Sequence, residues 1–394
     1  MSGLFEVAAV FLRLGCISFG GPIAHIGYLR TELVEKRQWL DDAQYGDLVA
    51  LCQFLPGPAS SQVVFGLGMQ RAGLLGALAA SVCFTLPSAI LMIGFAYGVA
   101  RATDVVGAGW LHGLKLAAVA VVAQAVWGMG KKLCTDRARV ALSIGAAAVL
   151  LALPGAATQL GVIAAGGVIG WWLYRQSLAA GPAPGAASSA RAHVAAAAAL
   201  VVFLALLFVL PAVSTATGSR DVAVFDAFYR SGSLVFGGGH VVLPLLRAEV
   251  VPRGWISDDQ FLAGYGAAQA LPGPLFTFSA YLGAAMRPGP SWVNGLYCLF
   301  AIFLPAWLLV GGALPFWHRL RAKRWAQAAL AGANAAVVGV LLAALYDPVF
   351  TEGVRGPRDV AAAIVAFGLL EHGKVPPWLV VAASAAAGQW LLVT

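Results

Sequence analysis

Charged residues are scarce in this chain of 394 residues: only 11% are charged, whereas 60% are hydrophobic. Soluble domains carry roughly 25% charged residues, so the composition excludes an ordinary soluble protein. It predicts an all-α polytopic protein of the lipid bilayer. The formal net charge of +8 does not indicate nucleic acid as a partner. Most Lys and Arg residues stand at the ends of apolar runs, where such residues orient a membrane protein.

The chain also lacks the motifs of metal binding and of hydrolytic chemistry. Its five cysteines are spread singly, without the CxxC or Cys and His spacing of a zinc site or redox pair. No HExxH motif and no GxxxxGK[ST] loop occurs. We therefore expect no cofactor, no metal, no ATP coupling and no enzymatic activity. No basic leader with an A-x-A cleavage site precedes the first apolar run, so we expect that run to be a retained helix.

The sequence contains one pattern of Gly and Pro residues that occurs twice. The first copy is Phe19-Gly20-Gly21-Pro22 followed by Leu55-Pro56-Gly57-Pro58, and the second is Phe236-Gly237-Gly238-Gly239 followed by Leu271-Pro272-Gly273-Pro274. Residues between these ends match at a nearly constant offset, among them Arg30 with Arg247, Glu32 with Glu249, Trp39 with Trp255, Asp42 with Asp258 and Gln53 with Gln269. Such a duplication within apolar sequence is typical of a transporter built from two structural repeats.

Thirteen apolar runs are candidate membrane helices, since about 20 residues span a bilayer. They lie near residues 3–21, 42–70, 73–100, 108–130, 138–153, 157–175, 193–211, 221–238, 258–286, 291–317, 325–346, 358–372 and 376–393. We predict a first repeat at 1–175, a flexible linker at 176–192, a connecting helix at 193–211 and a second repeat at 212–394. The mixed segments 23–40 and 241–256 are predicted to be amphipathic interfacial helices.

The segments that contain Pro-Gly-Pro allow two interpretations: one spanning helix broken at mid-depth, or a hairpin that leaves on the side it entered. Charge favours the broken helix. With the N-terminus in the cytoplasm, the basic clusters at 131–139 and 319–324 then both face the cytoplasm, as the positive-inside rule requires. Six spans and one connecting helix start the second repeat on the opposite face. The repeats are therefore predicted to be inverted, with the C-terminus in the periplasm.

Each Pro-Gly-Pro motif leaves a half-helix whose first N–H groups are unpaired within the membrane. Free N–H groups and the positive end of the helix dipole attract an anion. We predict a substrate site from the Pro-Gly-Pro residues, the repeated glycines and the hydroxyls that follow: Gly20, Gly21, Pro56, Gly57, Pro58, Ser60, Ser61, Gly237, Gly238, Gly239, Pro272, Gly273, Pro274, Thr277 and Ser279. The alternative is a packing kink whose hydroxyls bind their own backbone.

Two arginines recur inside apolar sequence. Arg13 and Arg230 occupy the same place in a repeated Phe-x-Arg-x-Gly, and an arginine there costs at least about 2.5 to 3.5 kcal/mol unless it faces a cavity, a partner or an anion. The guanidinium fork suits a tetrahedral oxyanion. Lys115 is a further candidate for the substrate site. For all three residues the alternative is a side chain that extends to the membrane surface.

A few ionisable residues are weaker candidates for proton coupling. His25 and His240 follow the glycine turns but do not align with each other, and Glu6 has no acidic counterpart. Placement of the histidines at the membrane interface is the favoured interpretation. Asp42 and Asp258 are expected to cap the helices that they precede. Arg30 with Glu32, and their counterparts in the second copy, are expected to form interfacial ion pairs.

These motifs resemble the chromate ion transporter family in its long, two-domain form. The resemblance is carried by the repeated Phe-Gly-Gly, the Trp-x-x-Asp stretches at Trp39 and Trp255, and the Gln-x-Leu-Pro-Gly-Pro that closes each copy. It covers both repeats. It implies a bacterial inner-membrane exporter of chromate that confers resistance, with sulfate as a related or competing oxyanion and the proton gradient or membrane potential as driving force. Position 239 holds Gly where the first copy has Pro22, so the halves need not contribute equally.

The residues alone indicate an inverted-repeat anion transporter. A sulfate or other oxyanion transporter, or an anion channel of the same fold, remains the nearest alternative, and a membrane-embedded enzyme is the alternative from another class. Whether the chain acts as a homodimer stays open.

Overall fold

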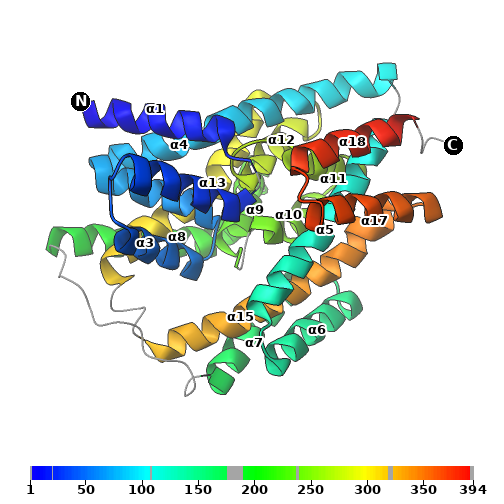
Figure 1. Cartoon of the computed structure of the whole chain (residues 1–394). Helices are drawn as coiled ribbons and strands as arrows, with labels where there is room; N and C mark the ends of the chain where they lie inside the picture. The colour runs from blue at the N-terminus through cyan, green and yellow to red at the C-terminus, as the bar shows by residue number, and fades with distance from the viewer. Residues whose placement is uncertain are drawn as a thin grey trace.

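The computed structural model describes residues 2–19, 21–106, 109–174, 190–236, 239–317 and 323–390. Within these ranges the chain forms helices and no strand (Figure 1). The predicted linker at 176–192 falls mostly on residues 175–189, which lie outside the described residues, as do Arg319 and Arg321 of the second basic cluster.

The helices follow one another in three groups. The first group is α1 (Ser2–Ile17), α2 (Gly21–Arg30), η1 (Thr31–Lys36), α3 (Asp42–Phe54), α4 (Ala59–Val106), α5 (Gly109–Leu133), α6 (Arg137–Ala152) and α7 (Ala156–Tyr174). The connecting helix α8 (Ala190–Thr217) is longer than the predicted 193–211. The last group is α9 (Arg220–Ser233), η2 (Gly239–Val241), α10 (Val242–Val250), α11 (Asp258–Ala268), η3 (Leu275–Thr277), α12 (Phe278–Ala285), α13 (Trp292–Ala313), η4 (Leu314–Phe316), α15 (Arg324–Ala344), η5 (Leu345–Phe350), α16 (Thr351–Gly353), α17 (Pro357–Glu371) and α18 (Pro377–Trp390).

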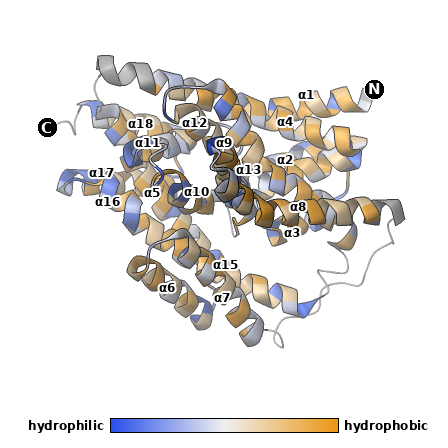
Figure 2. Ribbon diagram, turned by 180° about the vertical axis from the view of Figure 1, so that it is seen from behind, coloured by the Kyte–Doolittle hydropathy of each residue, from blue (hydrophilic) through white to orange (hydrophobic). Residues whose placement is uncertain are grey.

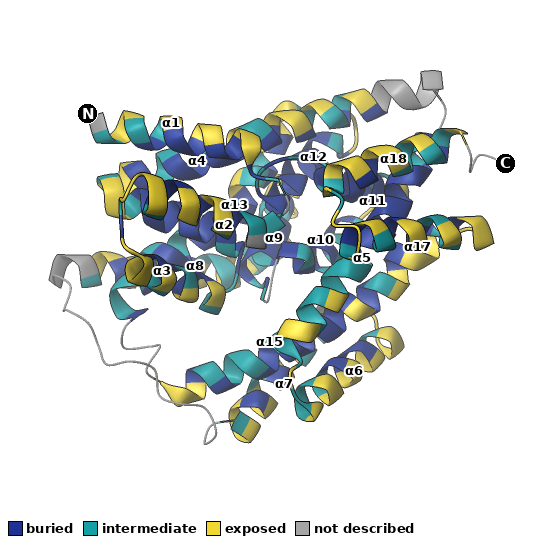
Figure 3. Ribbon diagram, viewed as in Figure 1, coloured by how far each residue is buried: buried dark blue, intermediate teal, exposed yellow. Residues whose placement is uncertain are grey.

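Several of these helices match a bilayer in length and composition. Among the described residues, five are long and apolar enough to cross one: Ala59–Val99, Gly109–Leu133, His193–Thr217, Trp292–Phe316 and Arg324–Gly353. The outer helices α6 and α8 carry mostly hydrophobic residues along their length (Figure 2). Their outward faces are exposed, whereas α11 and α12 at the centre are buried (Figure 3). An apolar exterior of this kind is suited to contact with lipid.

The helices on either side of each Pro-Gly-Pro motif fold back on each other. The Tyr281 hydroxyl of α12 donates a hydrogen bond of 2.9 Å to the Gln260 carbonyl of α11. In one straight helix these residues would lie about 31 Å apart. In the first copy, a Cβ added at Gly66 of α4 would lie 2.6 Å from Leu48 of α3. The predicted spanning helix broken at mid-depth is therefore wrong, and each copy forms a helical hairpin.

The helix that opens each repeat also folds back. Arg37, which follows η1, forms an ion pair of 3.6 Å with Glu6 near the start of α1. Arg230 of α9 approaches Glu249 of α10 at 3.5 Å. We call α1 with α2 and η1 the first hairpin, α3 with residues 59–71 of α4 the second, α9 with η2 and α10 the third, and α11 with η3 and α12 the fourth.

The long helix α4 changes direction once. Ala72 and Gly73 have non-helical dihedral angles, with Gly73 at φ +64°. Residues 59–71 belong to the second hairpin, and residues 74–106 form a separate long arm. The long arm packs on α1, where a Cβ at Gly15 would overlap the Phe84 carbonyl. Small residues let helices approach this closely within a membrane.

The same packing recurs in the second repeat. Helix α9 packs on α13, where a Cβ at Gly232 would overlap the Ile302 carbonyl. Glycines also line the contact of α7 with α15, where Gly170 meets Gly332, and the contact of α5 with α18, where Gly113 meets Gly388. The contact of α1 with α4 thus has an equivalent in that of α9 with α13, and the two contacts between the repeats, α7 with α15 and α5 with α18, are equivalent to each other.

Candidate functional site

The Pro-Gly-Pro turns are shaped by their residue types. Proline lacks an N–H group and disfavours the helical conformation in the residue before it, so α3 ends at Phe54 and α11 ends at Ala268, before the motifs. The central glycines, Gly57 at φ +122° and Gly273 at φ +95°, occupy backbone conformations that other residues rarely adopt. The motif therefore produces a sharp turn that returns the chain.

The turn of each repeat is bonded to the opening hairpin of the other repeat. The Gly57 N–H donates to the Val235 carbonyl at 2.6 Å, and the Gly273 N–H donates to the Ser18 carbonyl at 2.8 Å. Ser18 and Val235 stand at matching positions at the ends of α1 and α9. The four hairpin tips thus meet in two equivalent crossed pairs at the centre of the molecule.

Buried hydroxyl groups join the two repeats beside these tips. The Ser88 Oγ of the long arm of α4 lies 2.7 Å from the Thr277 Oγ1 of η3. Thr277 itself donates to the Pro274 carbonyl at 2.8 Å, so Ser88 is the donor in their shared bond. Ser279 is satisfied by the Phe276 carbonyl of its own turn at 2.7 Å. For Ser279 the alternative of a self-satisfied hydroxyl describes the observed contact.

His25 completes the polar group on the side of the first repeat. Its ring is fully buried, with Nε2 at 3.0 Å from the Ser18 carbonyl and Nδ1 at 3.4 Å from the Ser60 Oγ. The Phe84 ring lies edge-on to it at 5.6 Å. The Ser18 carbonyl therefore accepts from two donors, His25 and the Gly273 N–H of the other repeat.

Some buried polar atoms at the tips have no hydrogen-bond partner among the described residues. They are the Ser18 Oγ, the Ser61 Oγ and the Gln62 Oε1. An unsatisfied buried polar group costs about 1 to 3 kcal/mol, so such groups indicate a ligand or water. Ser61 stands in the first turn of α4, where the helix also offers unpaired N–H groups. The Gln62 Nε2 donates to the Pro56 carbonyl at 2.7 Å and so holds the turn.

The two repeated arginines lie on the opening hairpins and face glutamates. Arg13 approaches Glu32 at 3.7 Å, and its side chain is 62% exposed. Arg230 is 26% exposed and is held at 2.6 Å by Asp226 as well as by Glu249. The Arg230 Nε is buried without a partner among the described residues. The two arginines thus occupy equivalent positions, but their charges are not neutralised to the same extent. The residue equivalent to Asp226 in the first repeat is Ala9, which cannot pair with Arg13.

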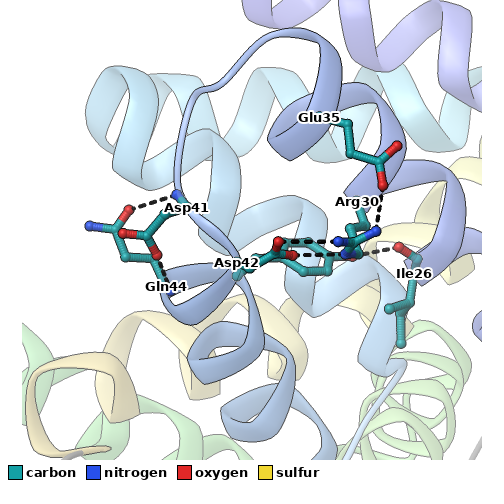
Figure 4. Close-up of polar contacts among 7 residues, drawn as sticks. Ile26, Arg30, Glu35, Asp41, Asp42 and Gln44 are labelled. Atoms are coloured by element: carbon teal, nitrogen blue, oxygen red, sulfur yellow. Dashed lines mark hydrogen bonds and ion pairs between the residues drawn. The ribbon is translucent and has the colours of Figure 1, made fainter.

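A second set of ion pairs fixes the segments between the hairpins. Arg30 binds Asp42 at 2.8 Å and also contacts Glu35 (Figure 4). Arg247 binds Asp258 at 2.7 Å in the equivalent place. The expected pairing of each arginine with the glutamate two residues on is therefore wrong, because residues two apart do not face each other on a helix.

The expected caps of α3 and α11 need the same kind of correction. Asp41 caps α3 and Ser257 caps α11, each in a reciprocal bond with the glutamine three residues on, shown for Asp41 in Figure 4. Asp42 and Asp258 lie in the first turn and serve the ion pairs instead. The capping residue stands one position earlier than expected.

The remaining candidates do not gather at one place. Lys115 of α5 is buried and bonded to Asp259 at the start of α11. Glu6 pairs with Arg71 at 2.8 Å, and the His240 Nδ1 lies 2.7 Å from the Tyr265 hydroxyl. Gly21 starts α2 and Gly239 starts η2. Gly20, Gly237 and Gly238 lie outside the described residues.

Four residues that the structure brings to the site or its charges are not predicted from the sequence: Ser18, Ser88, Gln62 and Asp226. A signal for Ser88 exists, because Pro87 recurs as Pro305, close to the repeat offset, and in each repeat the next residue packs on the glycine turn of the other repeat. Asp226 stands four residues before Arg230, the spacing of a helical ion pair. Gln62 has no such signal.

Comparison with known proteins matches both halves of the chain to one family. The family model for chromate transporters matches residues 5–171 and 222–389. The chain is 30% identical to a chromate transport protein of Pseudomonas aeruginosa, over 98% of this chain and 92% of that protein. It is 26% identical to a probable chromate transport protein of Synechococcus elongatus, over 98% and 95% of the two chains. A chromate transport protein of Cupriavidus metallidurans is also 26% identical, over 98% and 92%. No solved structure matches the chain.

Proposed function

Because the chain belongs to the chromate transporter family, we propose that it is a secondary transporter that exports chromate across the bacterial inner membrane and so confers chromate resistance. The observation that carries the proposal is the family match to both repeats, whose hairpin tips meet in a buried polar centre. Sulfate, which has nearly the same shape and charge, is the expected competing ion. An anion channel of the same fold is the alternative.

We propose that the oxyanion binds between the crossed tips. The supporting groups are the first-turn N–H groups of α4 and the hydroxyls of Ser61 and Ser18, which are buried without partners among the described residues. Helix N-termini attract anions, but each supplies only about half a charge. A dianion also needs a cationic side chain to offset its desolvation. Arg13 or Arg230 is proposed to supply it, with Lys115 as the next candidate.

The two repeats, 1–175 and 212–394, are proposed to be inverted in the membrane. Glu6, Arg37 and Arg71 meet at one end of the molecule, and α4 leads from there to the other end, where the Tyr97 hydroxyl accepts from the Trp292 N–H. At that end Arg220 of the third hairpin also contacts the Arg287 carbonyl after the fourth. These contacts support hairpins that enter from opposite ends of the molecule in the two repeats. Helix α1 starts at the first of these ends, and α18 finishes toward the other (Figure 1).

This arrangement makes all four hairpins re-entrant and leaves nine crossings: residues 74–106 of α4, then α5, α6, α7, α8, α13, α15, α17 and α18. The number replaces the thirteen predicted spans. Because two segments per repeat stop crossing, the parity is unchanged, and the charge argument still places the N-terminus in the cytoplasm and the C-terminus in the periplasm.

Reporter fusions test this topology. A fusion in the basic loop at Lys132 is expected to report the cytoplasm, and fusions after Pro288 and after Thr394 the periplasm. If the Pro288 fusion reports the same side as Lys132, the fourth hairpin enters from the wrong side and the inverted arrangement is incorrect.

Counterflow distinguishes a transporter from a channel and from an enzyme. In inverted vesicles we expect saturable chromate uptake that is inhibited by sulfate and accelerated by chromate preloaded on the opposite side. Vesicles with an empty vector are the control. Uptake that neither saturates nor shows counterflow would favour a channel. Absence of uptake at normal membrane levels would refute the proposed function.

A further inference from the structure

His25 lies where three parts of the proposed site meet. Its Nε2 faces the Ser18 carbonyl at 3.0 Å, and a carbonyl can only accept, so Nε2 carries the hydrogen. In the neutral ring Nδ1 is then an acceptor, and the Ser60 hydroxyl, at 3.4 Å, donates to it. Ser60 stands in the first turn of α4, beside the unpartnered Ser61 hydroxyl.

We propose that His25 takes up one proton when the oxyanion binds and returns it when the oxyanion leaves, so that oxyanion binding is linked to the protonation of one buried histidine. This inference rests on the proposed function. The proton from water binds Nδ1, which becomes a donor, and the Ser60 oxygen becomes the acceptor. The Ser60 hydrogen can then turn toward the oxyanion. One proton thus adds a positive charge and a hydroxyl donor to the site, and no covalent bond between heavy atoms changes.

The surroundings of His25 make the anion the natural partner of the charged ring. From α1 and α4 the ring is contacted by Ser18, Ser60 and Phe84, none of which ionises near neutral pH. From α3 the Tyr45 hydroxyl binds the Ile26 carbonyl next to the ring. No carboxylate among the described residues bonds to His25. Burial disfavours an unpaired imidazolium, so the ring charges only when a nearby dianion stabilises it.

The buried histidine beside the helix N-terminus occurs at this position in the first repeat only. The position equivalent to His25 is Val242, which is fully buried. The crossed tips are otherwise equivalent, so this difference would assign proton uptake to the first repeat and to the end of the molecule from which its hairpins enter. His240 of the second repeat is held by the Tyr265 hydroxyl at 2.7 Å, so we assign one proton, that of His25, to each oxyanion.

Calorimetric titration of purified protein with chromate tests the inference. Titrations at alkaline pH, where chromate is wholly dianionic, in buffers of different ionisation enthalpy give the protons taken up per chromate. For the unchanged protein we expect about one proton and an affinity that weakens about tenfold per pH unit, as linkage to one proton requires. His25→Gln should bind chromate without proton uptake and with an affinity independent of pH. His372→Gln, in the turn after α17, is the control and should behave as the unchanged protein.

The outcomes separate this inference from the proposed function. If the unchanged protein does not bind chromate, the proposed function fails. If it binds without proton uptake, or if His25→Gln takes up the same proton, the role of His25 is refuted while the function stands. Should His25→Gln fail to fold, Ser60→Ala decides: it should keep the proton uptake but bind about tenfold more weakly, the loss of one charge-assisted hydrogen bond. Unchanged affinity in Ser60→Ala would overturn the relay.

Discussion

Gly273→Ala and Gly57→Ala are each expected to lower the rate of chromate transport by more than about tenfold. Both glycines hold backbone conformations in which a side chain costs at least about 1 to 2 kcal/mol. A Cβ at Gly273 would lie 3.1 Å from the Ser88 Cβ, and a Cβ at Gly57 would lie 2.8 Å from the Gln62 Nε2. Any shift that relieves this crowding breaks a bond between the repeats, from Gly273 to Ser18 or from Gly57 to Val235.

The measurement is the initial rate of chromate uptake in inverted vesicles, corrected for the amount of protein in the membrane. We expect a loss of more than about tenfold for each variant, since 1.4 kcal/mol already corresponds to a factor of ten. Gly218→Ala is the matched control, because Gly218 also has a positive φ, +61°, but no neighbour within 4 Å of an added Cβ. Near-normal transport by Gly273→Ala would show that the crossed tips tolerate displacement and do not form the site.

The double variant with Arg13→Ala and Arg230→Ala is expected to weaken chromate binding by more than about a hundredfold, because a desolvated dianion would lose its cationic partners. Each single variant should have a smaller effect. We expect Arg13→Ala to be the more harmful, since Arg13 shares one glutamate with Lys36 and Arg37, whereas Arg230 is neutralised by Asp226 and Glu249. Lysine at either position keeps the charge but loses the fork, so its effect should be intermediate.

Glu32→Gln separates anion binding from a structural role. If Arg13 only anchors the first hairpin through Glu32, removing either partner should impair transport equally. If Arg13 binds the oxyanion, Glu32→Gln should preserve or strengthen chromate binding, because a competing negative charge is gone. The readout is the apparent affinity for chromate and its inhibition by sulfate at matched membrane levels. An unchanged affinity in the double arginine variant would leave both residues as structural ion pairs.

The two repeats can be predicted from the sequence because each needs the same residue types at its turns. Pro-Gly-Pro ends a helix wherever it occurs, so helix ends near Leu55 and Leu271 follow from local chemistry. The direction of the chain after the turn does not. A broken helix and a hairpin use the same residues, and only contacts between distant side chains, such as Leu48 with Gly66 or Tyr281 with Gln260, distinguish them.

Charge could not decide that question, for a reason visible in the structure. The positive-inside rule was applied to two topologies that differ only in whether the Pro-Gly-Pro segment crosses the membrane. Making that segment re-entrant changes the number of membrane crossings in each repeat by one. The opening helix of each repeat also returns, as the contact of Arg37 with Glu6 shows. With both hairpins of a repeat re-entrant, as proposed, two changes of one crossing cancel, so the expected sides of the chain ends are the same under both topologies.

The sequence predicts which turns form the candidate site, but only some of the residues that line it. Gly57, Gly273 and Thr277 could be named because they recur or follow the motif. Ser18 could not be predicted, because a serine in an apolar run carries no local sign of the partner that folding brings to it, whereas the recurring proline before Ser88 is a signal that the sequence does hold. The arginines were named correctly as repeated features, but their glutamate partners depend on how each opening hairpin folds back.

The position of bound chromate tests most directly whether the oxyanion binds between the crossed hairpin tips. Anomalous scattering from chromium in crystals grown with chromate gives the position of the ion independently of the refined protein. We expect a chromium peak between the crossed tips, within hydrogen-bond reach of the Ser61 hydroxyl and the first turn of α4, and its loss in Gly273→Ala. A peak only at the exposed Arg13 and Glu32 pair, or elsewhere away from the tips, would contradict it.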